Sequence, residues 1–221
     1  MATIVGNFVI PAMIVPILAR PEMLDAMLLT IDYPIEHLVI IDNGHCVKEV
    51  TAKHVHNIHI VTMPSNLGVA GSWNLGIKSL PFAPYWLIAN FDVTWPEGSL
   101  ERFDKEATAH ELVLSDAFPP WAAFALGAAV VNAVGLFDEA LHPAYFEDLD
   151  YERRCERIGP MIRRTDIPIN HANSSTLKAG YEQRNNETYD SNMKYYHDKM
   201  SRNDYSEGVW NVRRRRILTW D

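Results

Sequence analysis

Short apolar runs alternate with stretches of helical periodicity in the first part of the chain. The apolar runs have the length of buried strands, and they cover residues 12–18, 37–42, 58–63 and 85–92. Pro21 is placed to begin a helix, and Trp73, Ile77 and Leu80 share one face of another. Strands that alternate with helical connections predict a mostly parallel central sheet flanked by helices on both faces, an α/β fold.

After residue 92 the alternation is looser. It predicts helices over 99–110, 128–136, 192–200 and around Tyr151, Cys155 and Ile158, with strands over 111–115, 121–127 and 163–170. From Gly180 the chain is polar and rich in Tyr. No internal repeat or linker interrupts it. We therefore expect one α/β domain over residues 1–180 and a C-terminal helical extension with a basic tail over 181–221.

Composition narrows the class of protein. A net charge of −8 argues against a surface that binds nucleic acid throughout, although Arg213 to Arg216 form a basic run between Trp210 and Trp220. That run is typical of an exposed tail. Cys46 and Cys155 make neither a disulfide framework nor a metal-site spacing, which favours a reducing compartment. The early apolar stretch is broken by prolines and too short to cross a bilayer, so we expect a cytoplasmic protein without a transmembrane segment.

Polar residues with chemical potential follow the predicted strands. Asp42, the loop 66–71 and Asp92 fall at the carboxyl ends of strands, where parallel sheets bind ligands. A carboxylate such as Asp92 is suited to hold a hard divalent cation, or simply to cap a turn. Gly68 and Gly71 precede a helix and would permit close approach of an anion, but their spacing is neither a dinucleotide fingerprint nor a P-loop.

Three acids begin the predicted helix near residue 150. The helix dipole explains Asp150, whereas Glu147 and Asp148 follow the apolar turn 143–146, where one carboxylate is suited to act as a general base. His171 is a candidate ligand for the same metal as Asp92. Three further histidines, which alternate around a strand start, are expected to be solvated: His54, His56 and His59.

Taken in order, these motifs resemble the inverting nucleotide-sugar transferases of glycosyltransferase family 2, which have the GT-A fold. The resemblance runs from about Ile14 to about Met200. Its most specific stretch is residues 66–76, which is similar to the family's Asn-x-Gly-x-(Ala/Gly)-Gly-x-x-Asn-x-Gly loop. The resemblance implies a nucleotide-sugar half over 1–92, an acceptor half over 93–180, and a donor site formed by Pro16, Asp42, Asn66, Gly68, Gly71, Asn74 and Asn90.

The family motif Asp-x-Asp is represented here by Asn90-Phe91-Asp92. This departure leaves Asp92, with His171, as the implied ligands for Mn²⁺ or Mg²⁺. Residues 135–139 and 145–151 look like the rhamnosyltransferase-like branch of the family. By that resemblance Asp148 is the general base, Glu147 orients the acceptor or the base, and Tyr195-Tyr196-x-x-Lys199 is similar to the closing segment.

The sequence thus predicts an inverting, metal-assisted glycosyltransferase that uses a UDP- or dTDP-sugar. Its acceptor is a hydroxyl of a glycan, a lipid-linked glycan, a protein or a modified DNA base. One alternative is a non-catalytic module that binds a sugar nucleotide or a partner, which the amide of Asn90 favours. Another alternative is a nucleotidyltransferase of similar fold. The chain lacks a Lys- and Arg-rich glycine loop near the N-terminus, which argues against this alternative.

Overall fold

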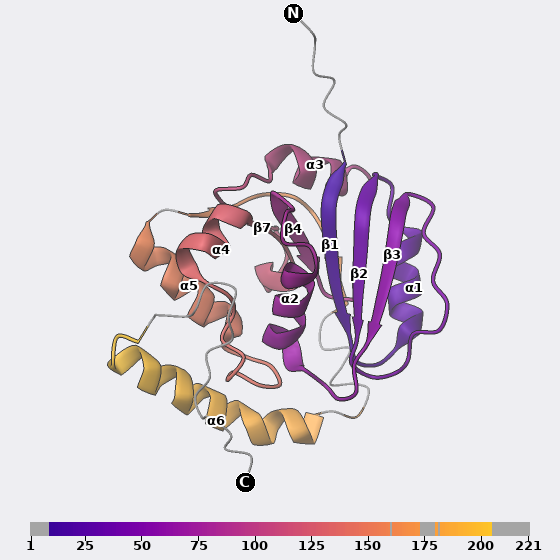
Figure 1. Cartoon of the computed structure of the whole chain (residues 1–221). Helices are drawn as coiled ribbons and strands as arrows, with labels where there is room; N and C mark the ends of the chain where they lie inside the picture. Colours follow the sequence, from indigo (N-terminus) through magenta and orange to yellow (C-terminus); the bar gives the residue numbers. More distant parts are fainter. Residues whose placement is uncertain (1–8, 160, 173–179, 181, 205–221) are drawn as a thin grey trace, which may run out of the picture.

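The computed structural model describes residues 9–159, 161–172, 180 and 182–204, and its larger sheet has the strand order β3-β2-β1-β4-β7-β6-β8 (Figure 1). A second, two-stranded sheet pairs β5 with β9. The strands are β1 (Ile10–Ile17), β2 (Ile35–Asp42), β3 (Val55–Thr62), β4 (Tyr85–Ala89), β5 (Val93–Thr94), β6 (Leu112–Leu114), β7 (Ala123–Gly127), β8 (Ile162–Arg164) and β9 (Asn170–His171).

The larger sheet is mostly parallel, as predicted. Strands β1, β2, β3 and β4 run in the same direction, and β7 is antiparallel to both of its neighbours. The register aligns Ile17 with Asp42 and Asp42 with Thr62, so β1, β2 and β3 end at the same level. Segments that follow these strands therefore emerge together at one edge.

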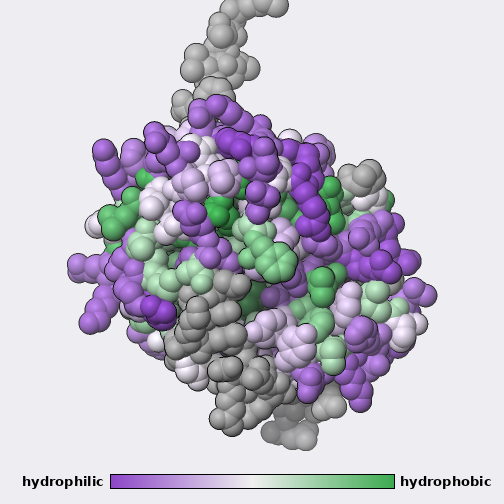
Figure 2. Space-filling view, turned by 180° about the vertical axis from the view of Figure 1, so that it is seen from behind, coloured by the Kyte–Doolittle hydropathy of each residue, from purple (hydrophilic) through white to green (hydrophobic). Residues whose placement is uncertain are grey.

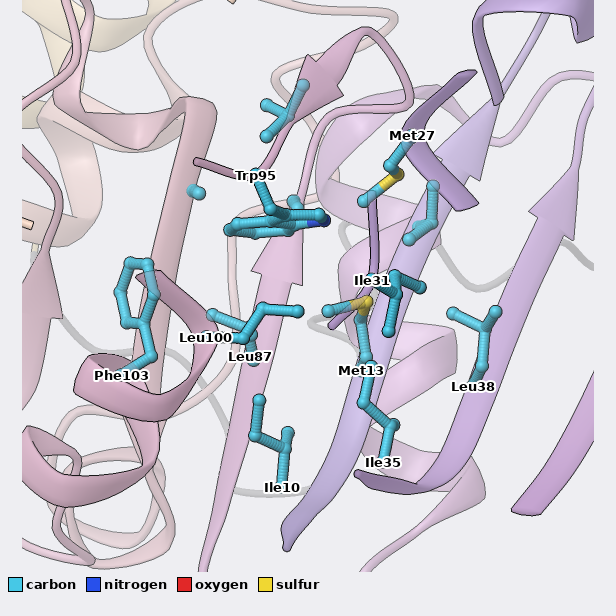
Figure 3. Packing of buried hydrophobic residues seen from close by; sticks show 14 of the residues in the cluster. Ile10, Met13, Met27, Ile31, Ile35, Leu38, Leu87, Trp95, Leu100 and Phe103 are labelled. Atoms are coloured by element: carbon cyan, nitrogen blue, oxygen red, sulfur yellow. The ribbon is translucent and has the colours of Figure 1, made fainter. Parts of the chain in front are cut away.

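Helices cover both faces of the sheet. They are α1 (Pro21–Leu29), α2 (Gly68–Ser79), α3 (Ser99–Glu106), α4 (Ala128–Val134), α5 (Glu147–Ile158) and α6 (Glu182–Ser201), with a 3-10 turn, η1, at Pro120–Ala122. Side chains alternate along β1. Met13 and Val15 pack with residues of α1 and α3 (Figure 3), whereas Ala12 and Ile14 pack with residues of α2, α4 and α5. The fold is thus a three-layer α/β arrangement.

Most predicted elements are present with shifted ends, but two predictions were wrong in extent. The strand predicted over 85–92 stops at Ala89, and Asn90 to Asp92 form a turn. The single late strand predicted over 163–170 is two short strands, β8 in the large sheet and β9 in the small one. Pro168 lies between them, and because proline has no N–H to donate, it interrupts a strand.

The predicted C-terminal helix extends over Glu182–Ser201, and its buried residues include Asn192 and Lys199. It lies on the side of the molecule toward which β1, β2 and β3 point (Figure 1). The basic run at 213–216 and the two flanking tryptophans lie outside the described residues.

None of the helices in the described ranges is long and apolar enough to cross a membrane. Viewed from behind, the surface that the described residues form is largely hydrophilic, and its apolar side chains are in small separate groups (Figure 2).

Candidate functional site

The turn after β2 is tied to the start of α2 by Asn43. The Asn43 side chain donates from Nδ2 to Ser72 Oγ over 2.9 Å, and its Oδ1 accepts from the Leu67 backbone N–H over 2.9 Å. Neither Asn43 nor Ser72 was assigned to the site from the sequence. Their hydrogen bonds place the loop 66–71 beside the ends of β1 and β2, where the resemblance had placed the donor.

Asp42 has a buried side chain that is engaged within the protein. Its carboxylate accepts from the backbone N–H groups of Gly44 and Cys46 over 3.1 Å and of Val47 over 3.0 Å. In this arrangement Asp42 shapes the loop after β2 instead of presenting a free carboxylate to a nucleobase. Pro16, also assigned to the donor, is half-buried in β1 opposite Ile41 of β2.

The glycine loop packs against another loop of the protein. Gly68 has φ of 74°, and a Cβ atom there would lie 2.7 Å from the carbonyl oxygen of Pro143. The N–H of Val69 donates to that same oxygen over 2.7 Å, and the N–H of Gly68 donates to Asn66 Oδ1 over 2.9 Å. Two of the first N–H groups of α2 are therefore used internally, and Gly68 is required by the neighbouring loop.

Two further residues assigned to the donor have internal roles. Asn74 is buried, donates from Nδ2 to Phe137 O and Glu139 Oε1 over 2.9 Å, and accepts from the Phe137 N–H over 2.9 Å. It holds the segment after α4 against α2. A Cβ atom at Gly71 would lie 3.2 Å from Leu67 Cβ, so this glycine allows a tight first turn of α2.

Asp92 and His171 are brought together by the small sheet. Val93 pairs with His171, and the N–H of Ala172 donates to Asp92 O over 3.2 Å. As a result, His171 Nε2 lies 3.1 Å from Asp92 Oδ1, and the two side chains are only 8% and 5% exposed. Asn90, which precedes them, has Nδ2 at 3.5 Å from the same His171 nitrogen. Asp92 and His171, predicted as metal ligands, and Asn90, predicted as a donor contact, are thus adjacent.

This pair has the chemistry of a divalent cation site. Imidazole nitrogen and carboxylate oxygen are ligands for Mn²⁺, and carboxylate oxygen for Mg²⁺. Two ligands at adjacent corners of an octahedron, each about 2.1 Å from the ion, are about 3.0 Å apart, close to the observed 3.1 Å. His171 Nδ1 is buried without a hydrogen-bond partner. No group of three or more His, Cys, Asp or Glu side chains suited to a metal occurs in the described part of the chain.

Glu147 and Asp148 begin α5 after a strained turn. Tyr145 and Phe146 have φ of 77° and 73°, which is unfavourable for residues with side chains and occurs often at functional sites. Glu147 is 7% exposed, and its Oε2 has no hydrogen-bond partner. Burial, with a further contribution from Asp148, raises the pKa of Glu147 to about 8. Near neutral pH, Glu147 is therefore mainly protonated.

Asp148 differs from its neighbour. Its side chain is half-buried, and its Oδ1 accepts from the Leu149 N–H over 2.8 Å. Burial and the charge of Glu152 raise the pKa of Asp148, whereas the backbone hydrogen bond opposes the shift. Asp148 is partly exposed, and a raised pKa makes a carboxylate a stronger base once it is ionised.

Helix α5 is connected to the turn that carries Asp92 through η1. Trp121 Nε1 donates to Glu152 Oε1 over 2.8 Å, one helical turn after Asp148. The next residue, Ala122, accepts from the N–H of Asn90 over 2.9 Å. The helix that begins with the two acids and the turn that carries Asn90 and Asp92 are thus attached to the same three-residue element.

Four charged side chains form a buried network that the sequence did not predict. Lys199 Nζ lies 2.9 Å from Asp138 Oδ2 and 2.7 Å from Asp150 Oδ1, and Arg154 Nε lies 2.9 Å from Asp150 Oδ2. All four side chains are at most 4% exposed. The Asp150 to Arg154 spacing of i, i+4 is visible in the sequence, but the partner from α6 is 49 positions after Asp150, and no local pattern indicates it.

No protein-family model and no curated protein matches this chain. Among solved structures, the mannosyltransferase PcManGT from Pyrobaculum calidifontis, in complex with GDP-Man and Mn²⁺, is similar with a TM-score of 0.50 and 16% identity, over 72% of this chain and 57% of that one. TarS 1-349 from S. aureus in complex with UDP is similar with a TM-score of 0.54 and 15% identity, over 72% and 58%. The chain thus spans less than two thirds of the length of these two structures. At these identities the likeness concerns the fold, and this chain has the mostly parallel, helix-flanked α/β fold of the GT-A glycosyltransferases.

Proposed function

We propose that this protein is an inverting glycosyltransferase that moves a sugar from a nucleotide diphosphate to an acceptor hydroxyl. The observation that carries the proposal is the pair of Asp92 and His171 at the sheet edge, connected through η1 to the helix that begins with Glu147 and Asp148. The GT-A structures with GDP-Man, UDP and UDP-GlcNAc support a nucleotide-sugar donor.

Asp92 Oδ1 and His171 Nε2 are the protein atoms that would hold Mn²⁺ or Mg²⁺. Such a cation, when bound, neutralises charge on the departing diphosphate. The amide of Asn90 lies beside His171 Nε2, where either end of the side chain can face a diphosphate oxygen or the ion. Asn90 thus supplies a neutral contact where a second carboxylate would add negative charge.

Asp148 acts as the general base. It removes the proton of the acceptor hydroxyl as the acceptor oxygen forms a bond to the anomeric carbon, and the bond from that carbon to the diphosphate oxygen breaks. Because attack and departure occur on opposite faces of the sugar, configuration inverts. Base catalysis of this kind contributes about 10² to 10⁴ in rate. Glu147, mainly protonated, is a hydrogen-bond donor that orients the acceptor oxygen.

The donor site in this proposal is narrower than the sequence predicted. Gly68, Gly71, Asn74 and Asp42 support the surrounding loops through internal contacts, as described above. Pro16, Asn66 and Asn90 are half-buried and remain candidate donor contacts, Asn66 through its Nδ2, since its Oδ1 accepts from the Gly68 N–H. The acceptor classes predicted from the sequence all present a hydroxyl, which is the group that Asp148 requires.

The test is nucleotide release from a panel of UDP-GlcNAc, GDP-mannose and dTDP-rhamnose with Mn²⁺, with water or an added glycan as the acceptor. We expect one donor to raise the melting temperature and to be hydrolysed slowly, with Asp148→Asn retaining the thermal shift and losing at least 100-fold in release. Binding without release by the wild-type protein would instead indicate the non-catalytic module. Normal release by Asp148→Asn would refute the base assignment.

A further inference from the structure

Helix α6 contacts the turn before the two acids through the buried side chain of Asn192. Asn192 is 4% exposed, and its Nδ2 donates to the carbonyl oxygens of Ala144 over 2.8 Å and His142 over 3.3 Å. Both acceptors lie in the turn immediately before Glu147. A single amide from the C-terminal helix thus binds two points of this turn.

The same turn supports the glycine loop on its other side. Pro143 O accepts from the N–H of Val69 over 2.7 Å, and His142 Nε2 lies 3.1 Å from Asn66 O. The turn 142–146 is consequently held between α6 and the loop before α2. A displacement of this turn would affect both Glu147 and the loop beside the strand ends.

Aromatic contacts hold the last residues of the turn. The rings of Phe146 and Tyr196 are stacked with centroids 5.6 Å apart, and Tyr189 contacts Tyr145 and Phe146 at 5.3 Å and 5.2 Å. Tyr145 and Phe146 are the two residues of this turn with positive φ. Because such a conformation persists only where surrounding contacts enforce it, α6 is part of what maintains the strained turn.

The charge network fixes α6 relative to α5. Lys199, seven residues after Asn192, pairs with Asp138 and with Asp150 in the first turn of α5, and Tyr195 Oη donates to Asp138 Oδ2 over 2.7 Å. Seven residues are about two helical turns, so Asn192 and Lys199 lie on the same face of α6. One face of the helix therefore contacts both the turn before Glu147 and the helix after it.

We propose that Asn192 is a positioning residue, which holds the turn 142–146 so that Glu147 and Asp148 are aligned for proton transfer. This inference rests on the proposed function, and it assigns to α6 a part of the catalytic apparatus. The contact acts through the backbone carbonyls of His142 and Ala144, not on a substrate. A misplacement of a reacting group by about 1 Å costs about 100-fold in rate, so loss of this contact should appear in kcat.

The experiment compares Asn192→Ala and Asn192→Asp with the wild-type protein. The aspartate has nearly the same shape but directs carboxylate oxygens at two carbonyl oxygens. With UDP-GlcNAc and Mn²⁺ at a temperature well below every melting point, we expect kcat for UDP release to fall about tenfold to 100-fold in both variants. The affinity for UDP should fall by a smaller factor than kcat, because Asn192 reaches the glycine loop only through the turn 142–146, whereas Asp92 and His171 are held together by the small sheet. Lys194→Ala, an exposed position of α6, is the matched control and should retain wild-type kcat.

Hydrogen exchange provides a reading that requires no turnover. In Asn192→Ala we expect faster exchange of the amides of residues 142–150 and of Val69, with unchanged protection in β1 and β2. If the wild-type protein releases UDP but the variants keep its kcat, the positioning role is refuted. If the wild-type protein releases no nucleotide, the proposed function fails, and unchanged exchange in 142–150 would then refute the contact's role separately.

Discussion

His171 Nε2 and Asp92 Oδ1 lie 3.1 Å apart although 79 positions separate them in the chain, because β5 and β9 pair beside them. A nitrogen and an oxygen ligand at this spacing match adjacent corners of one coordination sphere. Neither residue would hold the ion strongly alone. Their juxtaposition is therefore the first feature to test.

Replacing either residue of this pair should remove metal binding. We expect Mn²⁺ with UDP to raise the melting temperature of the wild-type protein, because a ligand that binds the folded state stabilises it, and to leave Asp92→Asn and His171→Ala unchanged. Thermal denaturation with and without Mn²⁺ measures this effect. His110→Gln, an exposed histidine elsewhere, is the control and should respond like wild type. An undiminished Mn²⁺ response in His171→Ala would show that the ion binds elsewhere.

Glu147 should make the stability of the protein depend on pH. Its pKa is about 8 in the folded protein and near 4.5 when unfolded, so between these values only the folded state retains the proton. The free energy of unfolding should fall as pH rises across this range, with a slope of at most about 1.4 kcal/mol per pH unit from this group. Urea denaturation at pH 5.5 and pH 7.5 measures it. Glu147→Gln, which stays neutral, should lose this contribution, and equal pH slopes in the two proteins would contradict the raised pKa.

Gly68 should be intolerant of a side chain. Alanine there meets both an unfavourable positive φ, which costs about 1–2 kcal/mol, and the carbonyl oxygen of Pro143 at 2.7 Å. Gly98 also has positive φ, at 78°, but a Cβ atom there would meet nothing within 4 Å. We therefore expect Gly68→Ala to reduce the free energy of unfolding by about 1 kcal/mol or more beyond Gly98→Ala. If denaturant titrations give similar losses of unfolding free energy for the two variants, the turn 142–146 moves to accommodate the added Cβ atom without a measurable loss of stability.

Lys199→Met should be strongly destabilising. The methionine fills a similar volume but leaves the buried carboxylates of Asp138 and Asp150 without their shared cation, a loss of about 3–5 kcal/mol in comparable pairs. Denaturant titration measures the change. Lys194→Met on the exposed side of the same helix should be nearly neutral. Adding Asp138→Asn to Lys199→Met should recover part of the loss, and no recovery would indicate that packing, not charge, is responsible.

The pattern of apolar residues was sufficient for the α/β class and for most of its elements. Buried strands of a parallel sheet are apolar on both faces, so β1, β2 and β4 are conspicuous as local runs. The extent of the late strand over 163–170 was wrongly predicted, because no local pattern marks where β8 ends, and the effect of Pro168 depends on which neighbours are available to pair. Such neighbours are set by the tertiary fold.

The candidate site was only partly visible in the sequence. Motif resemblance identified Asp92, His171, Glu147 and Asp148, whose positions in the structure are consistent with a common edge. It assigned Asn74 and Gly68 to the donor site and gave no sign of their internal contacts with Phe137 and Pro143. An amide or a glycine has the same local signature in either role, and only its spatial neighbours decide which one it has.

The sequence by itself determined the order of strands and helices and the residue types at their ends, because hydrophobic periodicity and turn chemistry are local. Only the tertiary structure decided that Lys199 and Asn192 of a polar helix are buried against α5 and the turn before Glu147. Their partners are about 50 positions away, and a buried charge or amide is stable only where such partners meet it. These contacts form only in the folded chain, and no single segment of the sequence contains both partners.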